Sequence, residues 1–406
     1  MGKNIKKYAF SVLFIMVLLL ESKASGYNDA LVIPADRNGM EHTAMQLASL
    51  MRVGWNLGNS LEAYGNDPTS SEMSWGNPMT TKAMIDSVAK AGFNAIRIPI
   101  RWYPHFAERP DGTIKIDSAW VQRVKQLVDW SRENDMYVII NTHHEKWLES
   151  HALYKDSAEV YRKERALWTE IAISFRDYDE HLLFAGTNEV HMPDNWGRPE
   201  QENVDVQNGF NQVFIDAVRA TGGRNTYRTL IVQTYVTNYE FGPELFRFPI
   251  DSTPGRMMVE MHFYDPWNYC GLGTDKYWGK TCNSFGIDGE AQEARLKSCL
   301  ASLKTIFSDR GYPIIIGECG VVRHEVAPEE DKSVIELARG YYLEMMVSEC
   351  RKNGAIPFLW DNGAAIGGGQ EKFGLFDRKA GMKQVDYIAI PAIMRGAQTP
   401  YLSCFR

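Results

Sequence analysis

The sequence predicts a single (β/α)8 barrel, the TIM-barrel fold, and three observations support this fold class. Short apolar segments alternate with longer segments of helical periodicity, which favours parallel strands joined by right-handed crossovers. The alternation gives eight strand–helix units, the number that closes such a barrel. A doubly wound open sheet is the competing fold, but the sequence shows no Gly-rich phosphate loop of the kind that nucleotide-binding sheets use.

A single domain is expected despite the length of the chain. The 406 residues could form two or three domains, yet barrels of about 250 residues or more also fold as one. No Pro/Ser/Thr-rich linker, low-complexity tract or break in composition divides the sequence. A content of 44% hydrophobic and 23% charged residues is ordinary for a soluble globular protein.

The expected strands are short apolar runs of the kind that are buried on both faces. They cover residues 53–57, 95–98, 137–140, 182–185, 230–233, 257–262, 314–317 and 356–360. Pro99 ends the second strand, and a long loop to about Gly289 follows the sixth.

The expected helices have apolar residues at helical spacing and recognisable ends. Gly92 ends one helix, Asp117 can cap the next, and Gly222 and Gly223 close another. The helices cover residues 41–50, 81–91, 117–130, 158–175, 206–220, 290–307, 333–350 and 385–394.

Residues 1–24 are expected to form a secretory signal peptide, followed by an N-terminal arm over residues 25–40. Lys3, Lys6 and Lys7 give the basic start, and residues 10–20 form an apolar core too short to span a bilayer comfortably. We therefore expect a secreted or periplasmic protein. Residues 1–24 carry four lysines and one glutamate, so their removal shifts the net charge from −7 to −10. This acidic balance argues against nucleic acid or a membrane surface as partner.

The six cysteines indicate packing and disulfides rather than metal binding. Export permits disulfides, and six cysteines allow 15 complete pairings between which the sequence does not choose. Cys270 and Cys282 share one polar, Gly-rich loop and are the best candidate pair. Cys319 is expected to be a free packed thiol at a buried strand end. No Cys or Cys/His spacing suggests zinc.

Polar and aromatic side chains gather just beyond the expected strands, where the active site of a barrel lies. They are Trp55, Asn56, Asn59, Arg97, His143, His144, Asn188, Glu189, His262, Tyr264, Glu318 and Trp360. A single glutamate at a strand end is more often solvated or salt-bridged. Packing alone does not readily explain the whole set.

Two of these residues, Glu189 and Glu318, follow the fourth and seventh strands and point to paired-carboxylate chemistry. Glycoside hydrolysis uses one carboxyl group to protonate the leaving oxygen and another to attack the sugar or to activate water. Retaining enzymes hold the two groups about 5–5.5 Å apart. Glutamate side chains on nearly opposite strands are long enough to meet at that separation.

A set of motifs resembles glycoside hydrolase family 5, the cellulase family, over about residues 41–396. In chain order they are Gly54-Trp-Asn-Leu-Gly-Asn-Ser-Leu-Glu-Ala63, Trp75-Gly-Asn-Pro78, Ile96-Arg-Ile-Pro99, Ile140-Asn-Thr-His-His-Glu145, Asn188-Glu189, His262-Phe-Tyr264, Gly317-Glu318 and Trp360-Asp-Asn362. The first two resemble subfamily 4, which implies endo-β-1,4-glucanases, including xyloglucan and mixed-linkage glucan hydrolases. Residues 41–406 would then form the catalytic domain.

The resemblance implies that Glu189 is the acid/base and Glu318 the nucleophile of a retaining enzyme. An acid must hold its proton until the glycosyl-enzyme forms, so we expect a raised pKa for Glu189 and an ionised Glu318. Arg97 is the cation best placed to keep Glu318 ionised, because opposite charge favours the ionised form.

The resemblance also implies supporting and substrate-binding residues. Tyr264 would hydrogen-bond Glu318, and His262 would lie near Glu189. Asn188 would contact the sugar 2-hydroxyl, and Trp360 would form an apolar floor beneath the reacting sugar. The remaining expected sugar contacts, on the glycone side, are Asn59, Glu62, His143 and His144.

Two positions depart from the family pattern, which usually has proline after the acid/base and an aromatic residue after the nucleophile. Here they are Val190 and Cys319, and we expect altered packing rather than lost chemistry. Shared metal binding by His143 and His144 is not expected, because adjacent residues in extended chain point to opposite sides. No metal or cofactor is predicted.

Tryptophans divide into two groups by position. Those on predicted helices are expected in the core: Trp120, Trp130 and Trp168. Those on loops or strand ends could stack on sugar rings, although one or two are expected only to anchor loops. They are Trp75, Trp102, Trp147, Trp196, Trp267, Trp278 and Trp360.

The leading hypothesis is a secreted retaining endo-β-1,4-glucanase that acts as a monomer on a polysaccharide. A β-mannanase is the second hypothesis, since the same constellation serves both sugars. The third is a non-catalytic glycan-binding barrel silenced by the two departures. The sequence leaves open the preferred polysaccharide, the disulfide connectivity and the oligomeric state.

Overall fold

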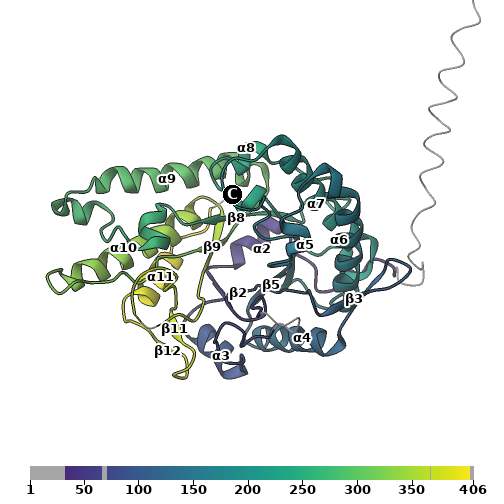
Figure 1. Ribbon diagram of the computed structural model, residues 1–406, viewed down its shortest axis with the longest axis horizontal. Coiled ribbons are helices and arrows are strands. Elements are labelled where there is room, and N and C mark those ends of the chain that lie inside the picture. The colour runs from purple at the N-terminus through teal and green to yellow at the C-terminus, as the bar shows by residue number, and fades with distance from the viewer. Residues whose placement is uncertain (1–32, 66–70, 366, 403–406) are drawn as a thin grey trace, which may run out of the picture.

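The computed structural model describes residues 33–65, 71–365 and 367–402, and its centre is a closed barrel of eight parallel strands (Figure 1). The strands are β1 (Gly54–Asn56), β2 (Ala95–Ile98), β5 (Tyr137–Asn141), β6 (Leu182–Ala185), β7 (Leu230–Gln233), β8 (Met257–Phe263), β9 (Ile314–Cys319) and β10 (Ala355–Leu359). Each pairs with its neighbours in chain order, and β1 pairs with both β2 and β10 to close the ring. The predicted (β/α)8 barrel is therefore confirmed.

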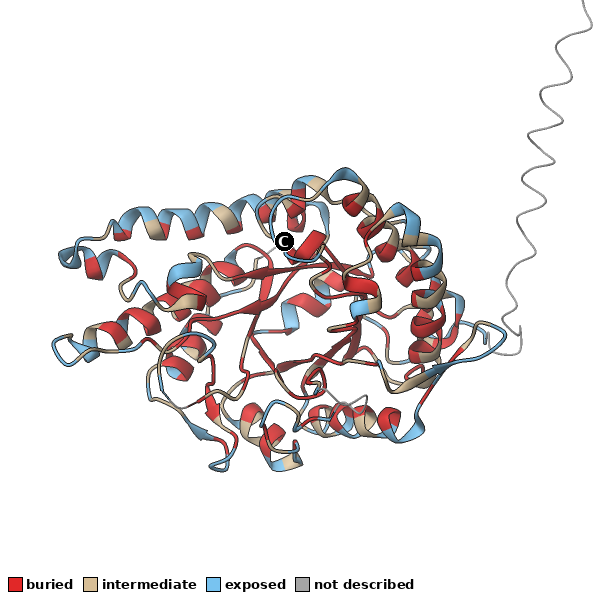
Figure 2. Ribbon diagram, viewed as in Figure 1, coloured by how far each residue is buried: buried red, intermediate tan, exposed pale blue. Residues whose placement is uncertain are grey.

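Helices surround the barrel and bury its outer surface (Figure 2). The long ones are α3 (Lys82–Lys90), α4 (Ser118–Arg132), α6 (Tyr154–Ser174), α7 (Gln201–Ala220), α9 (Gly289–Ile306), α10 (Lys332–Lys352) and α11 (Ala389–Ala397). Asp117 caps α4 as expected, since its carboxylate accepts a hydrogen bond from the backbone N–H of Ala119 at 2.9 Å. Among the described helices none is long and apolar enough to cross a bilayer.

Short elements fill the connections. Two antiparallel pairs are β3 (Phe106–Glu108) with β4 (Ile114–Ile116), and β11 (Phe376–Asp377) with β12 (Lys383–Gln384). Two four-residue helices are α5 (Lys146–Glu149) and α8 (Gly242–Leu245). The remaining turns are η2 (Gly223–Thr226), η3 (Tyr235–Thr237), the π-helical η4 (Asn268–Leu272), η5 (Lys280–Phe285) and η6 (Ser308–Arg310).

Three sequence expectations need correction. The fifth unit has no long helix, because Pro243, Pro249 and Pro254 interrupt the chain between β7 and β8 and leave only η3 and α8. Helices α6 and α7 begin earlier than predicted, at Tyr154 and Gln201. Helix α11 begins later than predicted, at Ala389, where the Asp386 carboxylate accepts from two backbone N–H groups.

The predicted disulfide between Cys270 and Cys282 is wrong, since both cysteines are free thiols. Cys270 is buried in η4 beside the Tyr342 hydroxyl, and Cys282 is buried separately in η5. The Cys319 prediction is confirmed: it is a buried free thiol whose sulfur donates to the carbonyl of Phe358 at 3.5 Å.

The barrel has two buried faces, which explains the continuous apolar runs in its strands. In β6, Leu182 and Phe184 face the helices, whereas Leu183 and Ala185 face the barrel interior. A short helix, α2 (Ala44–Leu50), packs its buried side against the interior residues and closes one end of the barrel (Figure 1). The opposite end is left free for the site.

The predicted signal peptide, residues 1–24, lies outside the described residues. Of the predicted N-terminal arm, residues 33–40 are described and pack against the turn after α7. Ile33 forms a parallel bridge with Gly222, and the N–H of Asp36 donates to the Gly223 carbonyl at 3.1 Å. This part of the arm is therefore held to the barrel.

A buried arginine, Arg228, ties the end of α6 to the start of β6. Its guanidinium is fully buried and donates to the side chain of Asn225 at 2.8 Å. It also donates to five backbone carbonyls, those of Phe175, Arg176, Tyr178, Asp179 and Leu182. Buried carbonyls need donors, so Arg228 stabilises the connection that leads into the strand before Glu189.

We predict that Arg228→Met lowers the free energy of unfolding by about 3 kcal/mol, because several buried carbonyls lose their donor. Urea denaturation and the melting temperature measure the effect. Arg198→Met is the matched control, since Arg198 forms an exposed ion pair with Glu244 and should matter by less than about 1 kcal/mol. Equal losses in the two variants would contradict the role given to Arg228.

Candidate active site

A cleft of about 1100 Å³ lies at the end of the barrel opposite α2. Its lining includes seven residues predicted from the sequence, namely Asn59, His143, His144, Glu189, Tyr264, Glu318 and Trp360. Three further tryptophans line it with exposed faces: Trp75, Trp196 and Trp267. A concave surface with aromatic walls and a few polar groups is typical of a ligand site.

Other tryptophans were expected on the same loops. Trp102 and Trp278 are fully buried and anchor loops, as expected for one or two of the group. Trp147 is partly buried against the core, and its indole N–H donates to the Glu145 carboxylate at 2.5 Å.

Glu318 points into the cleft because of a bulge in β9. The alternation of a regular strand would carry Ile315 inward and Glu318 outward toward the helices. Instead Met261 pairs with Ile316 and the next residue, His262, pairs with Glu318, so Gly317 is an extra residue in β9. A β-bulge re-aims the following side chain, and here it turns Glu318 into the barrel mouth.

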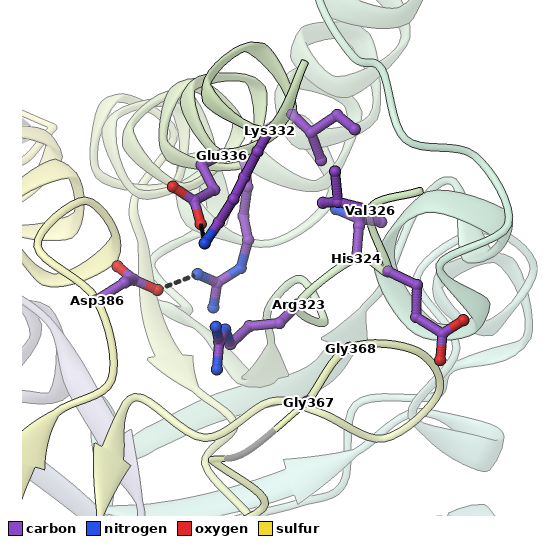
Figure 3. Close-up of a pocket in the computed structure, with 11 residues that line it drawn as sticks. Arg323, His324, Val326, Lys332, Glu336, Gly367, Gly368 and Asp386 are labelled. Atoms are coloured by element: carbon purple, nitrogen blue, oxygen red, sulfur yellow. Dashed lines mark hydrogen bonds and ion pairs between the residues drawn. The ribbon is translucent and has the colours of Figure 1, made fainter. Parts of the chain in front are cut away.

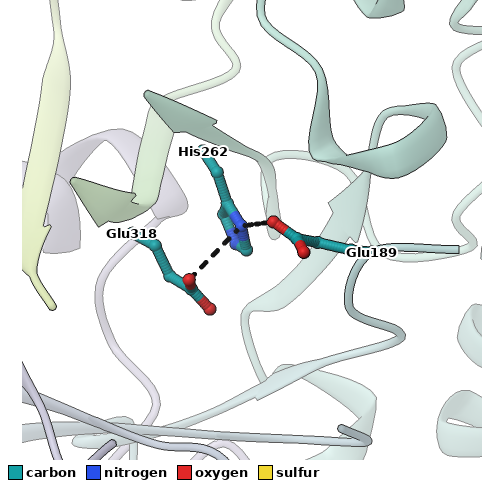
Figure 4. Close-up of side chains that lie close together, drawn as sticks. All are labelled: Glu189, His262 and Glu318. Carbon is teal, nitrogen blue, oxygen red and sulfur yellow. Dashed lines mark hydrogen bonds and ion pairs between the residues drawn. The ribbon is translucent and has the colours of Figure 1, made fainter. Parts of the chain in front are cut away.

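Glu189 follows β6, and His262 on β8 lies between it and Glu318 (Figure 4). His262 Nδ1 is 2.6 Å from Glu189 Oε1 and 3.7 Å from Glu318 Oε2. One carboxylate oxygen from each glutamate and one nitrogen of His262 all lie within 4.8 Å of one another. The two strands predicted to bring the carboxylates together, the fourth and seventh of the barrel, do so.

Two donors hold Glu318. Arg97 Nη1 donates to Oε1 at 2.9 Å, and the Tyr264 hydroxyl donates to Oε2 at 3.3 Å. Burial, followed by the nearby Glu318 charge, raises the pKa of Tyr264 well above its ordinary value, so the phenol keeps its proton. A metal ion could be ligated at this spacing, but Arg97 already supplies positive charge against Glu318.

The protonation of the cluster differs from the expectation that Glu189 has a raised pKa. Burial disfavours a charged His262, but Glu318, Glu189 and Glu260 outweigh burial and raise its pKa to about 9. Burial would also raise the pKa of Glu189, yet the hydrogen bond from His262 lowers it. The pKa of Glu318 is raised, chiefly by burial, which runs against the expectation for an ionised nucleophile, although His262 and Arg97 both act to lower it. This order of pKa values favours a positively charged imidazole on His262, 2.6 Å from Glu189.

Both His143 and His144 face the cleft, which corrects the expectation that adjacent residues point to opposite sides. His144 has a left-handed backbone with φ of 54°, and this turns its ring to within 4.4 Å of His143, edge to face. Burial lowers the pKa of His143 well below its ordinary value and that of His144 to about 4. Two neutral imidazoles are suited to hydrogen bonds with sugar hydroxyls.

Two predicted sugar contacts are placed differently from the rest. Glu62 is fully buried and outside the cleft lining, and its carboxylate accepts from the backbone N–H groups of Asn59 and Ser60. The structure thus gives Glu62 the role of holding the turn that presents Asn59, rather than of touching substrate. Asn188 is buried as well, with its side chain between Arg97 at 2.9 Å and His143 at 3.3 Å.

The two positions that depart from the family pattern are packed without disturbing the carboxylates. Val190 is fully buried in an apolar cluster with Leu148, Phe210 and Tyr235. Cys319 faces the helices from β9. Both side chains point away from the cleft lining, as the expectation of altered packing requires.

Sequence reasoning missed three buried carboxylates around the site. Glu145 accepts from the backbone N–H groups of Trp102 and Tyr103, and Glu149 accepts from that of His144 at 2.9 Å. Glu260 contacts Arg97 inside the barrel. Its position two residues before His262 on one strand was the available signal, since residues two apart share a face.

A second hollow, of about 440 Å³, lies beside the first turns of α10 (Figure 3). Its charges are largely paired, with Arg339 2.7 Å from Asp386 and Lys332 3.6 Å from Glu336. Neither tryptophan nor tyrosine is found among its described lining residues, so it offers no flat surface to a sugar ring. The larger cleft is the candidate active site.

Comparison with known proteins identifies relatives of this chain. A xyloglucan-specific endo-β-1,4-glucanase of Bacteroides ovatus is 39% identical over 375 residues, which cover 90% of this chain and 72% of that protein. The solved structure of a Bacteroides ovatus GH5 xyloglucanase with a XXXG heptasaccharide matches with a TM-score of 0.80 and 37% identity, covering 90% of this chain and 79% of the other.

A GH5-4 broad specificity endoglucanase from Clostridium acetobutylicum matches with a TM-score of 0.75 and 32% identity. That match covers 88% of this chain and 99% of the other. The family description "Cellulase (glycosyl hydrolase family 5)" matches residues 61–366. With these sequence matches, the shared barrel and the carboxylate pair at its mouth, the chain belongs to the cellulase family, glycosyl hydrolase family 5.

Proposed function

We propose that this protein is a secreted endo-β-1,4-glucanase that hydrolyses soluble β-glucans with retention of anomeric configuration. The observation that carries the retaining mechanism is the spacing of Glu189 and Glu318, whose nearest oxygens lie within 4.8 Å. Inverting enzymes separate their carboxyl groups by about 6.5–9.5 Å to admit a water molecule, whereas retaining enzymes hold them about 5–5.5 Å apart.

In the first step, Glu318 attacks the anomeric carbon while the leaving oxygen takes a proton from Glu189. Glu318 suits the nucleophile role because Arg97 and Tyr264 fix both of its oxygens. Glu189 suits the acid role because its side chain is 28% exposed to the cleft and 2.6 Å from protonated His262. His262 keeps its own proton and donates to the Glu189 carboxylate that remains.

In the second step, Glu189 removes a proton from water as the water attacks the glycosyl-enzyme. The C–O bond to Glu318 breaks and the carboxylate is released next to Arg97. The proton from water stays on Glu189, which restores the acid, and His262 remains protonated throughout. One short contact thus supports both the acid and the base function.

The substrate class follows from the cleft and from the relatives. The cleft is open, and its four tryptophans (Trp75, Trp196, Trp267 and Trp360) offer apolar faces for several sugar rings. The Bacteroides ovatus relative is xyloglucan-specific, and the Clostridium acetobutylicum structure is of a broad specificity endoglucanase. We propose neutral β-1,4-glucans, among them xyloglucan and mixed-linkage glucan. Export by the N-terminal segment would bring the enzyme to these polymers.

Retention predicts the first product. Proton NMR of early hydrolysis of a β-glucan should show the β-anomer, with the α-anomer appearing later by mutarotation. Initial release of the α-anomer would exclude Glu318 as a nucleophile and would contradict the proposed retaining mechanism.

The two glutamates should differ in a diagnostic way. Glu318→Ala should lower kcat on every substrate by at least about 10⁴-fold, because no covalent intermediate can form. Glu189→Ala should retain most of its first-step rate on a dinitrophenyl glycoside, whose leaving group needs no proton, and lose about 10²–10⁴-fold on a polysaccharide.

A surface variant, Glu344→Ala, controls for folding, since Glu344 pairs with exposed Arg395. Equal behaviour of Glu189→Ala and Glu318→Ala on the activated substrate would contradict the division of roles.

A substrate panel tests the specificity. We expect kcat/KM to be highest on xyloglucan and mixed-linkage glucan, lower on carboxymethylcellulose and lowest on galactomannan, with slow action on crystalline cellulose. A preference for galactomannan would make the protein a β-mannanase. Tight binding of these polymers without turnover would make it a non-catalytic glycan-binding barrel.

A further inference from the structure

Glu260 is a fully buried carboxylate one layer below the cleft. It lies on β8 at the inner face of the barrel, two residues before His262, and it pairs across the sheet with Gln233 on β7. Its Oε1 is 2.9 Å from Arg97 Nε and 3.6 Å from His262 Nε2. Its Oε2 accepts from Gln233 Nε2 at 2.7 Å. The side chain therefore contacts both cations of the site.

The charges around the site explain why a third carboxylate is placed there. Arg97 lies between Glu260 on its Nε side and Glu318 on its Nη1 side. His262 lies between Glu260 on its Nε2 side and Glu189 on its Nδ1 side. Two buried cations would repel each other without a carboxylate beside both. Arg97 holds the pKa of Glu260 below its ordinary value despite burial, so Glu260 is charged throughout the working range.

We propose that Glu260 is a positioning residue whose fixed charge keeps His262 protonated and holds Arg97 against Glu318 during the whole catalytic cycle. The inference rests on the function proposed above and assigns the electrostatic support of Glu189 and Glu318 to Glu260 acting through His262 and Arg97. Glu260 itself reaches neither the cleft nor a substrate.

The glycosyl-enzyme makes this charge necessary. Glu318 is then an uncharged ester, so His262 loses the carboxylate that contributes most to its raised pKa. Glu260 cannot be esterified, because it is buried beneath the site, and its charge stays beside His262 Nε2. His262 therefore keeps its proton, continues to donate to Glu189, and leaves Glu189 ionised to act as the base.

Strand β9 is shaped to admit this side chain. A Cβ on Gly317 would lie 1.9 Å from Glu260 Oε1, so only glycine fits at that point. The same glycine is the extra residue of the bulge that turns Glu318 inward. The position of Glu260 and the direction of Glu318 thus depend on one residue.

The groups that influence titration at this point come from every neighbouring strand. Arg97 is on β2, Glu189 follows β6, and Glu318 is on β9. The further titratable groups around the site are His143, His144, Glu149, His191 and Tyr264. Glu260 and Glu318 are the two carboxylates that each contact both Arg97 and His262. Removal of the Glu260 charge is therefore expected to shift both the acid and the alkaline limb of the pH profile of activity.

The variant Glu260→Gln tests the proposal through the pH dependence of kcat/KM on a soluble β-glucan. Loss of the charge lowers the pKa of His262, so the alkaline limb should move down by about one pH unit. Glu260 also raises the pKa of Glu318, so the acid limb should move down as well. Glu260→Asp keeps the charge and should keep both limbs near the wild-type positions.

Glu164→Gln is the matched control. Glu164 is a fully buried carboxylate on α6 that burial keeps uncharged by raising its pKa, so the wild-type profile should persist. A loss of activity in Glu260→Gln that is the same at every pH would overturn the proposal and make Glu260 merely structural.

A second measurement uses the wild-type protein and does not depend on a variant that folds. A 2-deoxy-2-fluoro cellobioside should trap the glycosyl-enzyme, and NMR of labelled histidine should show His262 still protonated at pH 7. A trapped enzyme with neutral His262 would overturn the role of Glu260 and leave the proposed function standing. Failure to form any trapped ester would instead count against the proposed function.

Discussion

The candidate active site depends on five charged side chains that are held together, mostly buried, at the mouth of the barrel. Glu189, Glu260 and Glu318 meet Arg97 and His262 at the barrel mouth, and four of the five side chains are less than a tenth exposed. Buried charges are stable only when each has opposite charge and hydrogen bonds around it. Arg97 meets this requirement with its three nitrogens, which contact Glu260, Glu318, Asn56 and Asn188. A closed barrel brings these residues together from five strands or strand ends that are far apart in sequence.

The interior of the barrel is divided along its axis into an apolar layer that stabilises the fold and a polar layer that supports the site. Its lower interior is apolar and is closed by α2, while the layer above contains Arg97, Gln233 and Glu260. The change from apolar to polar occurs within two residues of a strand, as from Met258 to Glu260 on β8. Rigid strands beneath the site therefore fix its side chains, and the loops above are left to shape the cleft.

Much of this could be predicted from sequence because strand periodicity and strand-end residues are local signals. The limits of β2, β6 and β7 were predicted to the residue, and the two glutamates were paired correctly. Other features depend on geometry that periodicity does not carry. Glu62 belongs to a strand-end motif, but its carboxylate accepts from a backbone N–H of the same turn instead of facing the cleft. The His144 side chain faces the cleft because its own backbone is left-handed. The relative pKa values of Glu189 and Glu318 depend on His262, which lies between the two carboxylates in the folded chain. The sequence does not show this position.

The bulge in β9 links the direction of Glu318 to the pairing register of one strand. Gly317 adds a residue that its neighbours on β8 and β10 do not match. A strand β9 that paired Gly317 regularly with its neighbours could still close the barrel and present its tryptophans, but regular pleating would turn the Glu318 carboxylate toward the helices. Such a protein would hold polysaccharide without cutting it. The step between a hydrolase and a lectin on this scaffold is therefore as small as one residue of pairing register.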